Sequence, residues 1–241
     1  MPFLFVNMAM TADGKIATAN RAVHSFGSRS DLAHLYELRA TADAIMCGAR
    51  TVEISQSILD NGGETFRKLR LKNGLAEFPL RILVSGSGSI NPAAEIFQKR
   101  FSPIILLTTR RAPATRLTQL RNLVDEIKFF GEKHLNFRAA LRWLREKRRV
   151  NRLLCEGGGD LNDALFRAGL VDEVNLTICP KIFGGSTAPT IAEGRGFPRL
   201  ANAETFELTS IKRKSHELFT VFSRAKSGTS DSFKLSYYEH R

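Results

Sequence analysis

The most regular pattern of apolar and polar positions in the chain lies between residues 152 and 185. A short apolar run at 153–155 predicts a buried strand, and the glycines at 157–159 predict a tight turn without side chains. Apolar residues then recur at helical spacing until Gly169, which can adopt the positive φ that often ends a helix. With a second strand at 174–179, the stretch predicts strand, glycine turn, helix and strand.

Strands and helices are predicted to alternate through the rest of the chain. A helix is expected at 30–39, with Ser30 or Asp31 available as its N-cap. The segment 55–73 carries glycines and charges without periodicity, and we predict a mobile loop there. The remaining strands are expected at 3–10, 44–47, 81–84, 103–108 and 126–130, and the remaining helices from 51 and at 93–100, 117–124 and 135–149.

This alternation predicts an α/β fold in a single domain, with a mostly parallel central sheet and helices on both faces. The pattern changes after 180, and the segments 206–213 and 217–224 are expected to be antiparallel strands that close one edge of the sheet. We place the domain at 1–224. Residues 225–241 are expected to form a tail or an added strand.

Composition narrows the class of protein. The chain has 241 residues, of which 43% are hydrophobic and 25% charged, as in ordinary globular proteins. The N-terminus lacks a signal peptide's basic region, and no run approaches the ~20 apolar residues of a membrane span, so we expect a cytoplasmic protein without a membrane partner. Cys47, Cys155 and Cys179 lack metal-binding spacing and are expected to be reduced core thiols, with no metal site.

The formal net charge of +12 admits two interpretations. Clustered lysines and arginines are typical of nucleic-acid binding proteins. Here the clusters are scattered along the chain, and the densest, at 142–152, continues a helix and is expected to face solvent. We therefore consider nucleic acid an unlikely partner and small anionic molecules a natural one.

The glycine turn at 157–159 has a possible function of its own. A strand, glycine turn and helix direct unpaired N–H groups and the positive end of the helix dipole toward one point, which suits a phosphate or pyrophosphate. The alternative is a tight turn that is needed only for close packing. Both interpretations stay open on the turn alone.

Four motifs together resemble the pyrimidine reductase domain of riboflavin biosynthesis. They are VNMAMTADGKIA at 6–17, LRA at 38–40, GARTV at 48–52 and CEGGGDLNDALFRAGLVDEVNLTICPKIFGG at 155–185. The resemblance covers about 3–224 and implies a dihydrofolate-reductase-like fold and a homodimer. It also implies NADPH-dependent reduction of a phosphoribosylaminopyrimidine at the ribose C1′, with hydride attack on the open-chain imine. The zinc deaminase signature H-x-E with P-C-x-x-C is absent from the sequence.

The resemblance also implies a set of cofactor residues. The positions that match the family's pyrophosphate site are Gly157, Gly158, Gly159, Asp160 and Leu161. Ala9 and Thr51 match positions that touch the cofactor, although Thr51 would also serve as an ordinary N-cap.

The adenosine end of the cofactor is expected to cross neighbouring strand ends, at loops 85–89 and 109–112. Ser85 and Gly86 in the first loop, and Arg110 with its neighbour Arg111 in the second, could hold a 2′-phosphate, and neither loop contains an acid that would repel it. We therefore expect NADPH to be preferred over NADH.

On the substrate side, the resemblance makes Lys15 and Glu156 the catalytic candidates. Glu156 matches the carboxylate that the family uses on the sugar, and Lys15 matches a basic residue near the substrate; each could instead be a solvated surface residue. Asp13, Ser25 and Arg39 are assigned to substrate binding.

The sequence departs from the family after Thr51. The D-P-x-L-T-x-R segment, whose arginine grips the substrate phosphate, is missing, and Ser55 stands where an acid is expected. Arg67 or Arg70 could replace that arginine only with a different loop path. Two alternatives therefore stay open: a reductase with a different pterin- or pyrimidine-like substrate, or a non-catalytic protein that binds nucleotides or nucleic acid on the same scaffold.

Overall fold

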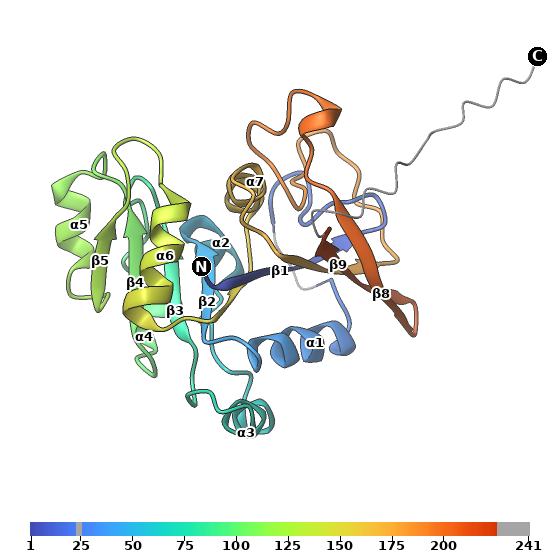
Figure 1. The fold of residues 1–241 in the computed structure, drawn as a ribbon, viewed down its shortest axis with the longest axis horizontal. Helices are drawn as coiled ribbons and strands as arrows, with labels where there is room; N and C mark the ends of the chain where they lie inside the picture. The colour runs from blue at the N-terminus through green and yellow to red at the C-terminus, as the bar shows by residue number, and fades with distance from the viewer. Residues whose placement is uncertain (23–25, 226–241) are drawn as a thin grey trace, which may run out of the picture.

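The computed structural model describes residues 1–22 and 26–225 (Figure 1). In these residues the strands are β1 (Phe3–Thr11), β2 (Ala44–Gly48), β3 (Leu80–Val84), β4 (Ile104–Thr108), β5 (Glu126–Phe129), β6 (Arg152–Cys155), β7 (Glu173–Cys179), β8 (Phe206–Lys214) and β9 (Glu217–Arg224). The helices are α1 (Arg29–Arg39), α2 (Ala49–Ser55), α3 (Glu64–Lys72), α4 (Glu95–Gln98), α5 (Ala114–Leu120), α6 (Phe137–Arg148) and α7 (Gly159–Arg167), with a short 3-10 turn at Leu200–Asn202.

All nine strands of the described residues form one sheet, in the order β5-β4-β3-β2-β6-β1-β7-β9-β8. Neighbours from β5 to β7 pair in parallel, whereas β9 pairs antiparallel with both β7 and β8. The predicted α/β fold with antiparallel C-terminal strands is thus confirmed. Because the carboxyl ends of parallel strands lie along one edge of a sheet, the loops after β1, β2, β3 and β6 meet there.

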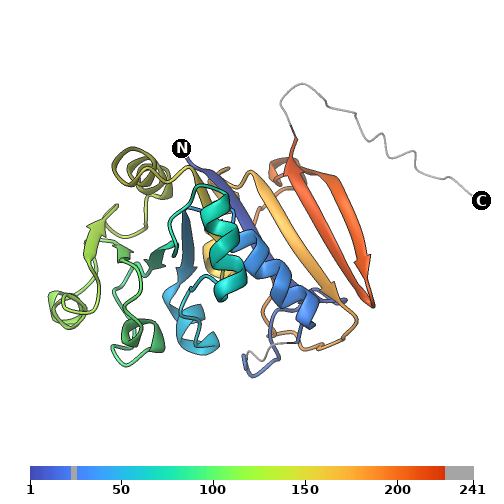
Figure 2. The same ribbon diagram turned by 90° about the horizontal axis from the view of Figure 1, so that it is seen from below.

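Helices cover both faces of the sheet, each over its own apolar cluster. One cluster includes Leu144 of α6 and Leu165 of α7, and the other includes Val52 of α2, Ile96 of α4 and Leu120 of α5. In Figure 1, α7 lies above β1 while α1 and α3 lie below it; Figure 2, seen from below, shows α1 and α3 in front of the sheet. Residue 153 and its apolar neighbours in β6 are fully buried between these layers.

The predicted strand, glycine turn and helix at 152–168 is confirmed. After β6, Gly157 and Gly158 have φ of +72° and +75°, and α7 begins at the next residue. Gly169 has φ +63° directly after the C-cap of α7. The N-cap expected for α1 was wrong, because the capping hydroxyl belongs to Ser28 rather than to Ser30 or Asp31.

Most predicted helices differ from the structure by one or two residues at an end, and α4 and α5 are the clearest cases. α4 ends at Gln98 because the buried guanidinium of Arg81 binds the carbonyls of Ile96 and Lys99, which closes the C-terminus of the helix. α5 begins earlier than expected, directly after Pro113, whose fixed φ suits a helix start.

The mobile loop predicted at 55–73 was wrong, because α3 occupies its second half. Its order depends on Arg70, a fully buried side chain. The Arg70 guanidinium donates to the carbonyls of Arg39 and Ala42 at 2.5 and 2.9 Å, and to that of Ala76 at 2.9 Å. Burial lowers the pKa of Arg70 to about 10. This arginine therefore ties α3 to the C-terminal end of α1.

Other expectations concern surfaces and termini. Cys47, Cys155 and Cys179 are free and buried, as predicted. The charged residues at 145–149 are exposed, as expected for the solvent side of α6 and its end. In the part of the chain described, no helix is long and apolar enough to cross a membrane. Apart from Ala225, the predicted tail or added strand at 225–241 lies outside the described residues.

Replacing Arg70 tests the anchoring of α3. Arg70→Met should lower the free energy of unfolding by about 3 kcal/mol, because up to three buried carbonyls lose their donors at roughly 1–3 kcal/mol each. Urea unfolding followed by circular dichroism measures the change. Lys72→Met, an exposed change on the same helix, is the control and should stay within about 0.5 kcal/mol. Equal stability of the two variants would contradict the anchoring role.

Candidate active site

A cavity of about 810 Å³ opens at the carboxyl ends of the parallel strands. Its wall includes Ala9 from β1, Gly48 from β2, Val84 from β3 and Glu156, which directly follows β6. Residues of α1, α2 and the start of α7 also line it, together with residues of several loops. Ligands of open parallel sheets bind at this edge, so the cavity is the natural place for the predicted site.

The glycine turn forms one end of the cavity, where Gly158, Gly159, Asp160 and Leu161 line it. A Cβ at Gly158 would lie 2.6 Å from the Thr51 hydroxyl oxygen, and one at Gly159 2.6 Å from the Glu193 Cγ. The N-terminus of α7 has no side-chain cap. Its first N–H groups and the positive end of its dipole are therefore available to an anion, and only glycine leaves the space.

Thr51 faces this turn from inside α2. The N-cap of that helix is Gly48, so the alternative role of Thr51 as an N-cap does not hold. Gly157 precedes the turn and is absent from the cavity wall; a Cβ there would lie 2.7 Å from the sulfur of Met8. Gly157 thus allows close packing on β1, while Gly158 and Gly159 shape the cavity.

The cavity wall also holds a buried ion-pair network centred on Arg39. Glu156 accepts two hydrogen bonds from the Arg39 guanidinium, from Nε at 2.6 Å and from Nη2 at 2.7 Å. Arg39 Nη1 donates to the Asp60 carboxylate at 2.8 Å and to its carbonyl at 3.1 Å. Arg39 is 4% exposed and the Glu156 side chain 11%. The structure therefore brings together two predicted site residues that are 117 positions apart.

The charges in this network stabilise one another. Burial alone would lower the pKa of Arg39, but Glu156 and Asp60 more than offset that effect, and the net pKa is raised. A buried charge without a partner costs several kcal/mol, so the pair is held in one geometry. With its donors directed at the two acids, Arg39 fixes the Glu156 carboxylate and is not free to bind a phosphate.

Asp13 and Lys15 lie beside the cavity, outside its wall. The Asp13 carboxylate accepts hydrogen bonds from the Thr11 hydroxyl and from the N–H groups of Phe183 and Gly184. The bond from Thr11 contributes most to lowering the pKa of Asp13. Asp13 thus ties the turn after β1 to the loop after β7.

Lys15 follows in the same turn, where its Nζ donates to the Ala188 carbonyl at 3.4 Å. Its neighbours Ile16 and Ala17 line the cavity. Ser25, assigned to the substrate from the sequence, lies outside the described residues.

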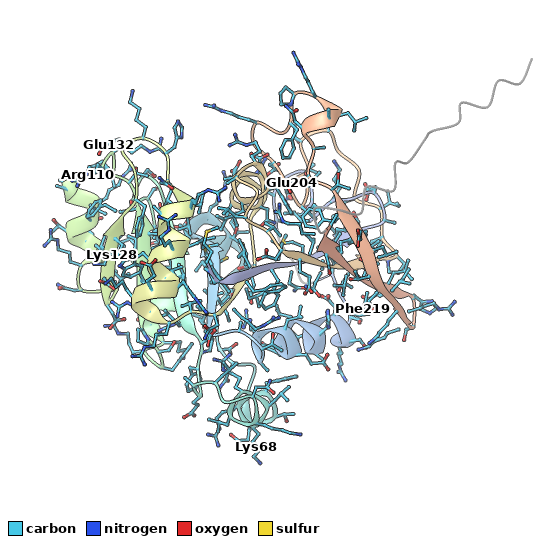
Figure 3. All side chains as sticks on the ribbon, in the orientation of Figure 1. Lys68, Arg110, Lys128, Glu132, Glu204 and Phe219 are labelled. Atoms are coloured by element: carbon cyan, nitrogen blue, oxygen red, sulfur yellow. The ribbon has the colours of Figure 1, made fainter. Side chains whose placement is uncertain are left out.

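Of the two loops expected to bind the adenosine end of the cofactor, 85–89 and 109–112, only the first lines the cavity. Ser85 and Gly86 line the cavity, and the Gly86 carbonyl accepts from the Thr109 hydroxyl at 2.6 Å. Arg110 lies outside the wall and pairs with Glu132 at 3.2 Å on the surface (Figure 3). Its neighbour Arg111 approaches the Gly86 turn, where its Nη2 would be 3.2 Å from a Cβ.

Three cavity features were missed by the sequence interpretation. Asp60 lies in the segment expected to be a loop, and no pattern marks it as a partner of Arg39. Asp31 was considered only as a helix cap but lines the cavity. Asn7 lines the cavity within an apolar strand, and a polar residue in such a run is the one signal that could have pointed to it.

Comparisons with known proteins show the family of the chain. The family model described as the RibD C-terminal domain matches residues 2–219. A 2,5-diamino-6-ribosylamino-4(3H)-pyrimidinone 5′-phosphate reductase from Archaeoglobus fulgidus is 32% identical over 206 residues, which is 86% of this chain and 93% of the relative.

Solved structures share the fold at lower identity. A pyrimidine reductase-like protein from Corynebacterium diphtheriae has a TM-score of 0.77 at 21% identity, over 93% of this chain and 92% of that one. A diaminohydroxyphosphoribosylaminopyrimidine deaminase/5-amino-6-(5-phosphoribosylamino)uracil reductase from Thermotoga maritima has a TM-score of 0.71 at 19% identity, over 93% of this chain and 57% of that one. The resemblance drawn from the sequence motifs is confirmed, and the chain belongs to the RibD C-terminal domain family.

Proposed function

We propose that this protein is an NADPH-dependent reductase of riboflavin biosynthesis that converts the ribosyl group of a phosphorylated ribosylaminopyrimidine to ribityl. The observation that carries the proposal is that the glycine turn of α7 and the Arg39–Glu156 pair open into the same cavity. Membership in a family whose relatives are named reductases implies a nicotinamide cofactor. The 2′-phosphate and the choice of substrate are the finer parts of the proposal.

The residues present fit a dinucleotide. A pyrophosphate needs backbone N–H groups at close range, and the turn offers them where any Cβ at Gly158 or Gly159 would collide. These glycines and the first turn of α7 would hold the pyrophosphate, with Ala9 and Thr51 beside them in the wall. When bound, NADPH supplies the hydride for reduction.

Glu156 lies next to both the proposed cofactor site and the proposed sugar site. It directly precedes the glycine turn, so a sugar hydroxyl bound to its carboxylate lies next to the cofactor site. Arg39 holds that carboxylate in one orientation before substrate arrives. Such alignment of two reactants can supply about 7–11 kcal/mol of the barrier.

Lys15 is the proposed cation near the imine nitrogen. Its Nζ rests on the Ala188 carbonyl at 3.4 Å, a long contact that a substrate can replace. An ammonium group there would stabilise negative charge or deliver a proton at the nitrogen as the carbon is reduced.

The arginine with which the family binds the substrate phosphate is missing from this chain. Other cations must therefore bind that phosphate. Arg67 pairs with Glu64 at 2.6 Å on the surface of α3, and Arg70 is buried against α1, so neither reaches the cavity wall. Arg21 and Arg50 do line the cavity. We propose that they receive the phosphate, which would give this chain a different phosphate site on the same scaffold.

The direct test is oxidation of NADPH by 2,5-diamino-6-ribosylamino-4(3H)-pyrimidinone 5′-phosphate, with the product identified by mass spectrometry. We expect one NADPH consumed for each ribityl product. Tight NADPH binding without oxidation would favour the non-catalytic alternative, and oxidation only with another pterin or pyrimidine would favour a different substrate. The homodimer and the cytoplasmic location stay predictions.

Adding a side chain at the glycine turn should weaken the binding of NADPH. Gly158→Ala should weaken NADPH binding at least about a hundredfold, because the new Cβ meets Thr51 where the pyrophosphate must approach backbone. Calorimetry gives the dissociation constant. Gly74→Ala is a matched control, since Gly74 has a similar φ of +72° and open space around it. If both variants bind NADPH like the wild type, the pyrophosphate assignment is wrong.

Cofactor preference separates the two neighbouring arginines. We expect the wild type to bind NADPH about ten- to a hundredfold more tightly than NADH, from one charge-assisted contact of roughly 1.5–3 kcal/mol. Arg111→Ala should remove this preference, because Arg111 approaches the Gly86 turn, while Arg110→Ala should change it less. If Arg110→Ala lowers the preference more than Arg111→Ala does, Arg110 is the residue that contacts the 2′-phosphate. A wild type without any preference for NADPH would refute the 2′-phosphate site.

Glu156→Gln should separate substrate from cofactor. Turnover should fall about a hundredfold because an amide cannot accept both Arg39 bonds, while the NADPH dissociation constant should change less than about twofold. Glu64→Gln, which breaks an exposed pair with Arg67, is the control and should retain turnover. A Glu156 variant that loses NADPH but keeps its rate would show that this division of the site is wrong.

A further inference from the structure

All five N–H donors of the Arg39 guanidinium bind acceptors of the protein itself. Two of them bind the Glu156 carboxylate, and one donates to the Ser57 hydroxyl at 3.4 Å. The remaining two, both on Nη1, bind the Asp60 carboxylate at 2.8 Å and the Asp60 carbonyl at 3.1 Å. The Asp60 carboxylate thus occupies the position on Nη1 that an anionic ligand would otherwise take.

The ion-pair network is negatively charged, because the carboxylates of Glu156 and Asp60 share a single guanidinium. Glu156 alone would neutralise Arg39 and leave Nη1 free for an anion. A neutral acceptor would satisfy Nη1 as well, but a second carboxylate also repels an incoming phosphate. The Asp60 side chain is 30% exposed and approaches Arg39 from outside the cavity wall, so small anions can reach its position from solvent.

The backbone on both sides of Asp60 is fixed. Leu59 has a φ of +55°, which a bulky residue rarely adopts, and its side chain is fully buried in the core. On the other side, the buried Asn61 donates to the Glu77 carbonyl at 3.0 Å. Unfavourable backbone conformations persist where the surroundings enforce them, and they cluster at functional sites. The conformation that places Asp60 on Arg39 is therefore enforced by its neighbours.

The family motif has the opposite charge in this part of the chain. By the resemblance, the segment after Thr51 carries the arginine that binds the substrate phosphate, whereas here that segment contributes Asp60. The proposed phosphate cations belong to other elements, Arg21 to the connection between β1 and α1 and Arg50 to α2. An acid therefore stands in the segment from which the family binds phosphate.

We propose that Asp60 is a specificity residue, which keeps phosphate off Arg39 so that the substrate group bound beside Glu156 is an uncharged group that carries hydroxyls. The inference rests on the proposed function, which places the sugar at Glu156, and it specifies the chemistry of that end of the substrate. Hydroxyls can donate to the carboxylates of the network, whereas a phosphate brings negative charge toward them. The substrate phosphate is thereby directed to Arg21 and Arg50.

The test measures the binding of inorganic phosphate by calorimetry. Asp60→Ser should bind phosphate about ten- to a hundredfold more tightly than the wild type, because two charged Nη1 donors become free. Asp60→Asn keeps an acceptor on Nη1 and removes only the charge, so it should gain about three- to tenfold, and it decides the matter if Asp60→Ser does not fold. A purely structural role for Asp60 would create no phosphate binding. Unchanged phosphate binding in both variants would overturn the proposal.

Two controls locate the gained site. The gain should persist when Asp60→Ser is combined with Arg21→Ala and Arg50→Ala, and its loss there would overturn the proposal, because phosphate would then bind at those arginines. Glu204→Ser removes the acid that pairs with Arg224 at 3.0 Å outside the cavity wall, and it should change phosphate binding less than about twofold. An equal gain in Glu204→Ser would show that any freed arginine binds phosphate, which would also overturn the role of Asp60.

Phosphate binding needs no hydride transfer, so the two proposals can fail separately. A gain of phosphate binding in Asp60→Ser, together with no reduction of the pyrimidine substrate by the wild type, would refute the proposed function alone. Turnover of that substrate by the wild type, with no gain in either Asp60 variant, would refute the role of Asp60 alone.

Discussion

The buried guanidinium of Arg39 is the contact on which the substrate end of the site depends. It joins the last turn of α1, the carboxylate that follows β6 and the loop that carries Asp60. Moving these charges out of water costs several kcal/mol for each ion, and only their mutual hydrogen bonds offset that cost. Because removal of any member leaves the others uncompensated, the network holds the Glu156 carboxylate in one position without any ligand.

The charge of the cavity wall differs from the net charge of the protein. The protein has a net charge of +12, which attracts anionic molecules from a distance. Among the described residues, the cavity wall nevertheless holds five carboxylates and three guanidinium groups, and Arg39 is already occupied. The net charge of the surface therefore favours the approach of anionic ligands, while the carboxylates in the wall favour groups that donate hydrogen bonds.

The connection from β6 to α7 places the two proposed ligand sites next to each other. Glu156 directly follows β6, Gly158 turns the chain with φ +75°, and the uncapped N-terminus of α7 follows immediately. The distance between the Glu156 carboxylate, proposed to bind the sugar, and the proposed pyrophosphate site is thus set by two peptide units rather than by the packing of separate elements. α1 brings Arg39 and Asp31 into the same cavity wall.

The sequence by itself determined the features that depend on neighbouring residues. Strand periodicity, the glycine turn before α7 and the stop at Gly169 were all predicted correctly, because local sterics and apolar spacing decide them. It failed at α3, whose order depends on Arg70 binding carbonyls about thirty residues away. Only the tertiary structure placed Asp60 on Arg39 and brought Asn7 and Asp31 into one cavity wall, since each of these arrangements joins distant segments whose partner no local pattern specifies.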